Sequence, residues 1–149
     1  MMIETLNDIF QRELQKLEDE IKSFPDETLL WKVSGDVKNS AGNLCLHLCG
    51  NLQHFIGASL GKTGYIRNRD AEFSTKNSSK EKLIDEIKNS KRAVKTALDA
   101  ISSNDLQKIY PQNFLGKEVS AEYFLIHLIS HFDYHLGQIN YLRRIMLKS

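Results

Sequence analysis

Three histidines recur at four-residue intervals late in the sequence, as His127, His131 and His135. In an α-helix, residues four apart lie one above the other on the same face, about 6 Å apart along the axis. Two neutral imidazoles placed in this way can point at one metal ion. The spacing therefore predicts a helix that offers part of a metal site, and the rest of the chain must supply the remainder.

Helical projection at about 100° per residue separates these histidines. His131 and His135 lie at the edge of the apolar face or within it, and Gln138 lies one turn beyond His135. His127 lies about 110° from the centre of that face and about 12 Å from His135 along the axis, too far to share a metal ion. We expect His127 at the surface or between subunits. Asp133 projects away from the core, so Gln138 is the better candidate to hydrogen-bond a ligand.

The two remaining histidines, His47 and His54, lie in an earlier segment and share one helical face about two turns apart. Cys45 and Cys49 are close to His47 in sequence but project about 160° away from it. We interpret both cysteines as buried structural thiols. Two interpretations of the inward histidines stay open at this point: ligands of a metal ion, or hydrogen-bonded core residues.

Four segments with apolar residues at helical spacing must position these side chains. They are expected at about residues 2–22, 40–60, 79–102 and 121–147. Little strand signal is present, and the polar connections at 61–78 and 103–119 are long enough to cross the end of a bundle. The pattern predicts an all-α four-helix bundle with a long crossover connection, in a single domain over residues 1–149.

Glycines interrupt the second of these helices at Gly42, Gly50 and Gly57. Each costs a helix about 1 kcal/mol relative to alanine. Because a glycine kept inside a helix usually marks close packing, we expect tight contacts along this helix.

Charges cluster in the crossover segment Arg67-Asn-Arg69-Asp70-Ala-Glu72-Phe73. This segment could overhang the histidines and bind an anionic substrate or a thiol cofactor. The alternative is a solvated loop with local ion pairs, and we favour it, because charged stretches usually form a solvated surface.

The length, composition and net charge of the chain exclude several classes of protein. The chain has 149 residues, of which 41% are hydrophobic, and its net charge of +1 gives no sign of nucleic acid or an anionic membrane as partner. No apolar run approaches the ~20 residues of a membrane span, and the first residues lack the features of a signal peptide. Two cysteines do not make a disulfide framework. We therefore expect a cytoplasmic protein.

The two histidine-containing stretches are together similar to a known pattern. They are His131-Phe-Asp-Tyr-His135-Leu-Gly-Gln138 in the fourth helix, and His47 within Asn43-Leu-Cys-Leu-His-Leu-Cys-Gly-Asn51 in the second. Members of the DinB-like superfamily of metalloenzymes, which includes the YfiT-type proteins, carry one histidine in the second helix and an HxxxHxGQ-like motif in the fourth. Over nearly its whole length, the chain resembles a poorly characterised branch of that superfamily.

This resemblance implies a metal ion held by His47, His131 and His135, in a bundle that is often a homodimer. It also implies thiol-dependent transfer or isomerisation, with a low-molecular-weight thiol such as bacillithiol or mycothiol activated at the metal. His54 has no place in this three-ligand motif. We expect it, like Asn51 and Gln138, to line the pocket or support a ligand, with a core position as the alternative for His54.

Three neutral histidines leave coordination positions open, where a divalent ion lowers the pKa of bound water to about 7 or holds a thiolate. Zinc is the first expectation, and nickel, iron or manganese accept similar ligands. No carboxylate stands beside the motif as in HExxH, which argues against a protease. The sequence thus predicts a metal-dependent transferase or hydrolase acting on a small molecule. The alternative is a non-catalytic metal-binding or stress-response protein in which the ion ties two helices together.

Overall fold

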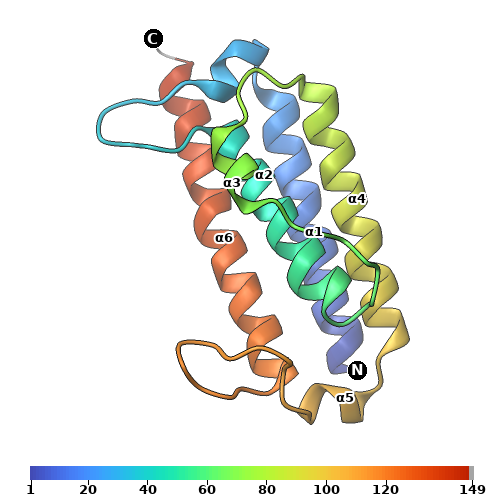
Figure 1. The fold of residues 1–149 in the computed structure, drawn as a ribbon. Helices are drawn as coiled ribbons and strands as arrows, with labels where there is room; N and C mark the ends of the chain where they lie inside the picture. Colours follow the sequence, from blue (N-terminus) through green and yellow to red (C-terminus); the bar gives the residue numbers. More distant parts are fainter. Residues whose placement is uncertain (148–149) are drawn as a thin grey trace.

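Four long helices lie side by side in the computed structural model, which describes residues 1–147 (Figure 1). They are α1 (Met2–Ser23), α2 (Ala41–Leu52), α4 (Lys80–Ala100) and α6 (Ala121–Met146). Helices α1 and α2 each pack against both α4 and α6, so the order around the bundle is α1, α4, α2, α6. The expected all-α four-helix bundle with a long crossover is confirmed.

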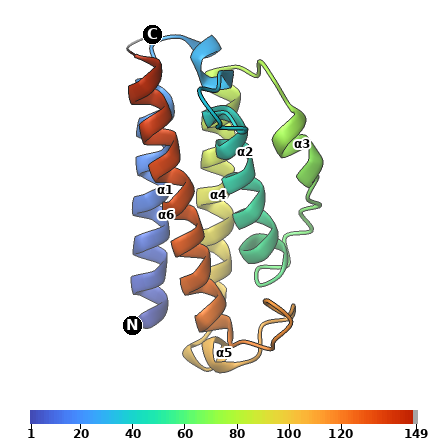
Figure 2. The same ribbon diagram turned by 90° about the vertical axis from the view of Figure 1, so that its left-hand side faces the viewer.

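The long crossover follows from the direction of the helices. Helices α1 and α6 run one way and α2 and α4 run the other (Figures 1 and 2). Since α2 and α4 are parallel, the chain must return along the bundle between them. It does so on the outer side of α2, where it forms the short helix α3 (Arg69–Ser74) (Figure 2).

Serine side chains begin three of the long helices. Ser40, Ser79 and Ser120 each accept a hydrogen bond from the backbone N–H three residues later. Such caps satisfy N–H groups that have no partner within the helix. Helix α1 buries one apolar stripe, which consists of Leu6, Phe10, Leu14, Leu17 and Ile21. Helix α2 is instead buried on nearly every side.

The remaining elements are short. A 3₁₀ helix, η1 (Glu27–Trp31), follows α1, and α5 (Ser103–Gln107) precedes α6. Residues Gln53–Ala58 form a π-helical continuation of α2, called η2. The segment expected as one helix over residues 40–60 therefore changes its hydrogen bonding after Leu52. None of the helices within residues 1–147 is long and apolar enough to cross a membrane.

Glycines in α2 do mark close packing. The indole of Trp31, at the end of η1, lies against Gly42, where an added Cβ would come within 2.8 Å of three ring carbons. The indole N–H donates to the carbonyl oxygen of Ser78, 3.1 Å away. Gly42 thus lets η1 and the end of the crossover close over one end of the bundle.

Candidate metal centre

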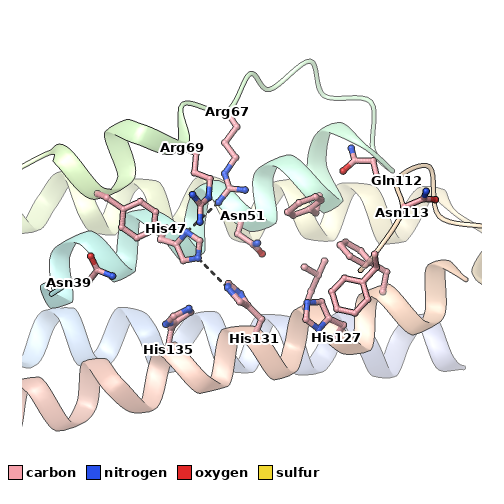
Figure 3. A pocket seen from close by; sticks show the side chains of 15 residues that line it. Asn39, His47, Asn51, Arg67, Arg69, Gln112, Asn113, His127, His131 and His135 are labelled. Atoms are coloured by element: carbon pink, nitrogen blue, oxygen red, sulfur yellow. Dashed lines mark hydrogen bonds between the residues drawn. The ribbon is translucent and has the colours of Figure 1, made fainter. Parts of the chain in front are cut away.

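Three histidine side chains from two helices converge at the centre of α2 and α6 (Figure 3). His47 comes from α2, and His131 and His135 come from successive turns of α6. One ring nitrogen from each lies within 4.8 Å of the corresponding atoms of the other two. The Nε2 atoms of His47 and His131 are only 3.2 Å apart. The cluster is one that could hold a metal ion.

The imidazole of His47 is oriented by a carboxylate from the crossover. Oε1 of Glu72, on α3, lies 3.1 Å from Nδ1 of His47, and both side chains are more than nine-tenths buried. An ionised carboxylate only accepts hydrogen bonds, so Nδ1 of His47 carries the hydrogen and donates it. The lone pair of His47 is then on Nε2, which faces His131.

Arg67 completes this arrangement beside Glu72, where one Nη also lies 3.3 Å from Nδ1 of His47. Its guanidinium donates to both carboxylate oxygens, from Nε to Oε2 over 2.8 Å and from an Nη to Oε1 over 2.9 Å. Burial on its own raises the pKa of Glu72, but the hydrogen bonds from His47 and Arg67 outweigh it and hold this pKa below its usual value. Glu72 is therefore an ionised acceptor for His47 at neutral pH.

Glu72 can reach His47 because α2 has no side chain at Gly50. A Cβ at this position would lie 1.9 Å from Oε2 of Glu72. The backbone of α3 is held as well, because the amide of Asn43 donates to the carbonyl oxygens of Glu72 and Thr75, over 2.9 and 2.8 Å. The charged crossover was interpreted as a solvated loop with local ion pairs. A local ion pair, Arg67–Glu72, is present, but it is buried against His47 and not solvated.

Sequence reasoning missed Glu72 as a functional residue. Two signals pointed to it separately: a glycine in the middle of α2, and a carboxylate in the one charged cluster of the crossover. Only the packing of α3 on α2 joins them, because Glu72 is 25 residues from His47 in the chain.

The two histidines of α6 have different partners. Nδ1 of His135 lies 2.7 Å from the amide oxygen of Gln138, which accepts its hydrogen and leaves Nε2 with the lone pair. Burial lowers the pKa of His135, and burial together with the neighbouring histidines lowers the pKa of His131 to about 4. Both rings are therefore neutral at pH 7, and neutral imidazole is the form that binds metal.

The residues fit a metal ion on two counts. Two nitrogens bound at 2.0–2.1 Å in tetrahedral geometry lie about 3.3 Å apart, close to the separation of the facing Nε2 atoms. Nδ1 of His131 is buried and has no hydrogen-bond partner within the described residues. An ion at Nε2 would leave the hydrogen of His131 on Nδ1, where a bridging water could accept it.

The other residues singled out in the sequence lie around this cluster or apart from it. Asn51 lines the adjoining cavity, but it is not a hydrogen-bond partner of a histidine, and its Oδ1 has no partner in the described part of the chain. His127 is outside the cluster of three histidines. Instead of facing open solvent it is half-buried against the ring of Phe114, with 4.2 Å between the ring centroids. Asp133 is exposed, as expected for a residue that projects away from the core, and its side chain lies beside Glu13 of α1.

His54 does not line the cavity, where Phe55 takes the position expected for it. Its ring packs on Phe55, with 4.7 Å between the ring centroids. The physical reason is the π-helical turn, which rotates the chain less per residue than an α-helix and so shifts the register beyond Leu52. The cysteines of α2 are buried and reduced, as expected, and the pKa of the Cys45 thiol is raised by its hydrogen bond to Cys49 and by burial.

A cavity of about 560 Å³ opens beside the three histidines (Figure 3). Its wall combines two arginines, four histidines, four carboxamide side chains and five apolar side chains. A volume of this size accommodates a small molecule next to the histidine nitrogens. A metal ion at this cluster would therefore be within reach of a ligand.

The sequence matches one family model along almost its whole length. The model, described as "Protein of unknown function (DUF1572)", covers residues 2–149. Comparison with curated proteins gives no match.

Two solved structures share the arrangement of helices. A conserved protein from Enterococcus faecalis superposes with a TM-score of 0.77 at 16% identity, over 98% of this chain and 97% of that chain. A DinB-like protein from Bacillus cereus ATCC 10987 superposes with a TM-score of 0.75 at 19% identity, over 96% of this chain and 91% of that chain. At these identities the likeness shows the fold alone. The DinB-like fold that the resemblance implied is thereby confirmed.

Proposed function

This chain belongs to the DUF1572 family and has the DinB-like fold, and we propose that it is a metal-dependent enzyme acting on a small molecule, with residues 1–149 as one domain. His47, His131 and His135 hold the ion, which is zinc in the first instance, with nickel, iron or manganese as alternatives. The observation that supports this proposal is the convergence of three histidine nitrogens within 4.8 Å at the wall of a 560 Å³ cavity.

The chemistry that suits this site is a thiol-dependent transfer, with hydrolysis as the second possibility. The ion supplies Lewis-acid activation of a thiol or a water molecule. Glu72 keeps the hydrogen of His47 on Nδ1, and Gln138 does the same for His135, so both rings present Nε2. The described residues lining the cavity include no carboxylate that could act as a separate general base.

Metal content tests the ligand set directly. Protein purified without a histidine tag is expected to carry about one ion per chain, and His47→Ala, His131→Ala and His135→Ala are each expected to lose it, because each removes one of three ligands. His127→Ala is the matched control and is expected to keep the ion. The measurement is elemental analysis. Loss of the ion in His127→Ala with retention in His135→Ala would contradict the assignment.

Catalysis is tested separately, by a thiol-transfer screen of the metal-loaded protein with electrophiles. Turnover that disappears in His47→Ala supports the enzyme. The alternative is a non-catalytic metal-binding or stress-response protein whose ion links α2 to α6. It predicts a closed site with a fourth protein ligand and no exchange of bound small molecules, which X-ray absorption spectroscopy of the loaded protein distinguishes.

A homodimer through the outer face of α6 is a further part of the proposal. Tyr134 and Tyr141 are two-thirds exposed on this face, with Gly137 between them. Nothing lies within 4 Å of a Cβ added at Gly137, so a second helix could approach there. Light scattering is expected to give the mass of two chains for the wild type and of one chain for Tyr141→Glu. A single-chain mass for the wild type would contradict the dimer.

A further inference from the structure

The cavity beside the histidines has two unlike ends. At one end, Arg67 and Arg69 lie above His47, and at the other, Gln112 and Asn113 close the cavity from the loop before α6 (Figure 3). The arginine end adjoins the cluster of three histidines. Three aromatic side chains form the other part of the wall, and they are Phe55, Phe114 and Phe124.

The arginine end favours negative charge. No aspartate or glutamate is among the described residues that line the cavity. Arg67 is already neutralised by the buried Glu72. Arg69 has no ion-pair partner anywhere in residues 1–147; its guanidinium is exposed and stacks on the ring of Phe73, 5.2 Å from the ring centroid. Arg69 is therefore the cation available for an anionic group, since guanidinium pairs well with carboxylate and phosphate.

The aromatic end favours an apolar group. The ring of Phe124 is 5.2 Å from that of Phe55 and 5.8 Å from that of Phe114, measured between centroids. These rings come from three different elements: η2, the loop before α6, and α6 itself. A patch assembled in this way inside a cavity offers an aryl or branched alkyl group contact on several sides.

A polar group on the wall separates the two ends. Asn51 lies beside His47, on the side of the loop that carries Gln112 and Asn113 (Figure 3). It is only 7% exposed, and its Oδ1 has no hydrogen-bond partner in the described residues. A buried acceptor without a partner is costly, so a ligand or a water that donates to it is favoured.

We propose that this cavity binds a small organic anion with an apolar end. Its carboxylate or phosphate group pairs with Arg69, and its aryl or branched alkyl group contacts Phe55, Phe114 and Phe124. This inference deepens the proposed function, because the central part of such a ligand would lie beside the metal-binding histidines. Binding of the anion itself depends on the cavity and can be measured with or without the ion.

Four probes separate the contributions of charge and apolar surface. They are 3-phenylpropionate (both features), 3-phenylpropanol (the ring alone), propionate (the charge alone) and phenyl phosphate, which tests the second anionic head group. Each is titrated into metal-free and zinc-loaded protein by calorimetry at constant ionic strength. We expect 3-phenylpropionate or phenyl phosphate to bind at least about tenfold more tightly than either single-feature probe.

Variants then assign the two ends. Arg69→Gln is expected to reduce the affinity for the aryl anion to that for 3-phenylpropanol, and Phe114→Ala is expected to reduce it toward that for propionate. Arg144→Gln is the matched control, because Arg144 also stacks on an aromatic ring at 5.2 Å, that of Tyr141, but lies outside the cavity. It is expected to leave every affinity unchanged.

Two results would overturn the proposal. One is equal affinity of the wild type for the aryl anion and 3-phenylpropanol, and the other is equal weakening by Arg69→Gln and Arg144→Gln. Failure of the wild type to bind zinc would overturn the proposed metal site and not the anion site. Anion binding is measured in metal-free protein as well, so the two outcomes can be distinguished. Circular dichroism of each variant distinguishes lost binding from lost folding.

Discussion

The orientation of the His47 imidazole depends on Glu72, whose carboxylate packs against Gly50 of α2. Glu72 fills the space that a Cβ at Gly50 would occupy. Gly50→Ala should therefore displace Glu72 and remove the acceptor of the His47 Nδ1 hydrogen. We expect a fall in metal affinity of about 10–100-fold, the range typical for loss of such a partner. Competition with a metal chelator of known affinity measures it, and Glu72→Gln should weaken binding in the same direction.

Gly137→Ala is the control for this change. Gly137 is also in a helix, but an added Cβ there meets nothing within 4 Å. Both substitutions gain helix propensity, worth about 1 kcal/mol. Only the substitution at Gly50 should cost metal affinity. Equal affinity in the two variants would mean that Glu72 does not support His47.

At the residue scale, the sequence was most informative where side chains repeat along one regular helix. Projection separated His127 from His131 and His135, because all three lie in the uninterrupted helix α6. The support given by Gln138 was also within reach, since it is three residues from His135. The support given by Glu72 was not, because it depends on how a distant segment packs on α2.

At the scale of elements, a buried carboxylate ties α1 to α4. Glu18 accepts from Lys22 of its own helix over 2.8 Å and from Lys91 of α4 over 3.2 Å. The hydrogen bond from Lys22, with that from Lys91, outweighs burial and lowers the pKa of Glu18 to about 2, from an ordinary 4.5. The interaction therefore stabilises the folded state above about pH 4.5 and is lost as the pH falls toward 2.

Glu18→Gln should consequently lower stability at pH 7 more than at pH 2.5. We expect a loss of about 1–2 kcal/mol at pH 7, after allowance for solvent around the half-exposed Lys22. Urea unfolding at the two pH values measures the difference. Asp99→Asn breaks an exposed pair with Lys95 and should change little at either pH. A loss at Glu18 that is independent of pH would contradict the role of its charge.

Element boundaries show where sequence periodicity stops being a guide. Three of the long helices, α1, α4 and α6, were expected within a few residues of their observed ends, because their apolar stripes have a regular period. The second was expected to reach about residue 60, whereas α2 ends at Leu52. Periodicity could not reveal the π-helical turn after Leu52, which depends on local hydrogen bonding. That turn is why Phe55 and not His54 lines the cavity. The short helix α3 was missed for a different reason: six residues are too few for a visible period.

At the scale of the whole molecule, the histidine cluster brings together α2, which precedes the crossover, and α6, at the end of the chain. An ion that binds only the folded chain stabilises it by about 2.7 kcal/mol when its free concentration is 100 times its Kd. For a chain of this size, that corresponds to a rise in Tm of about 5–10 °C. Thermal unfolding with zinc and with chelator measures the rise. It should vanish in His47→Ala, and an undiminished rise in that variant would place the ion elsewhere.

The separation of the three histidines along the chain also bears on when a metal ion could bind in a cell. His47 and His131 are 84 residues apart. At 5–20 residues per second, a ribosome needs roughly 4–17 s to synthesise that interval. Throughout that time the nascent chain exposes one ligand without its partners. An ion held by all three histidines would therefore bind only after the segment that carries His131 and His135 has been synthesised.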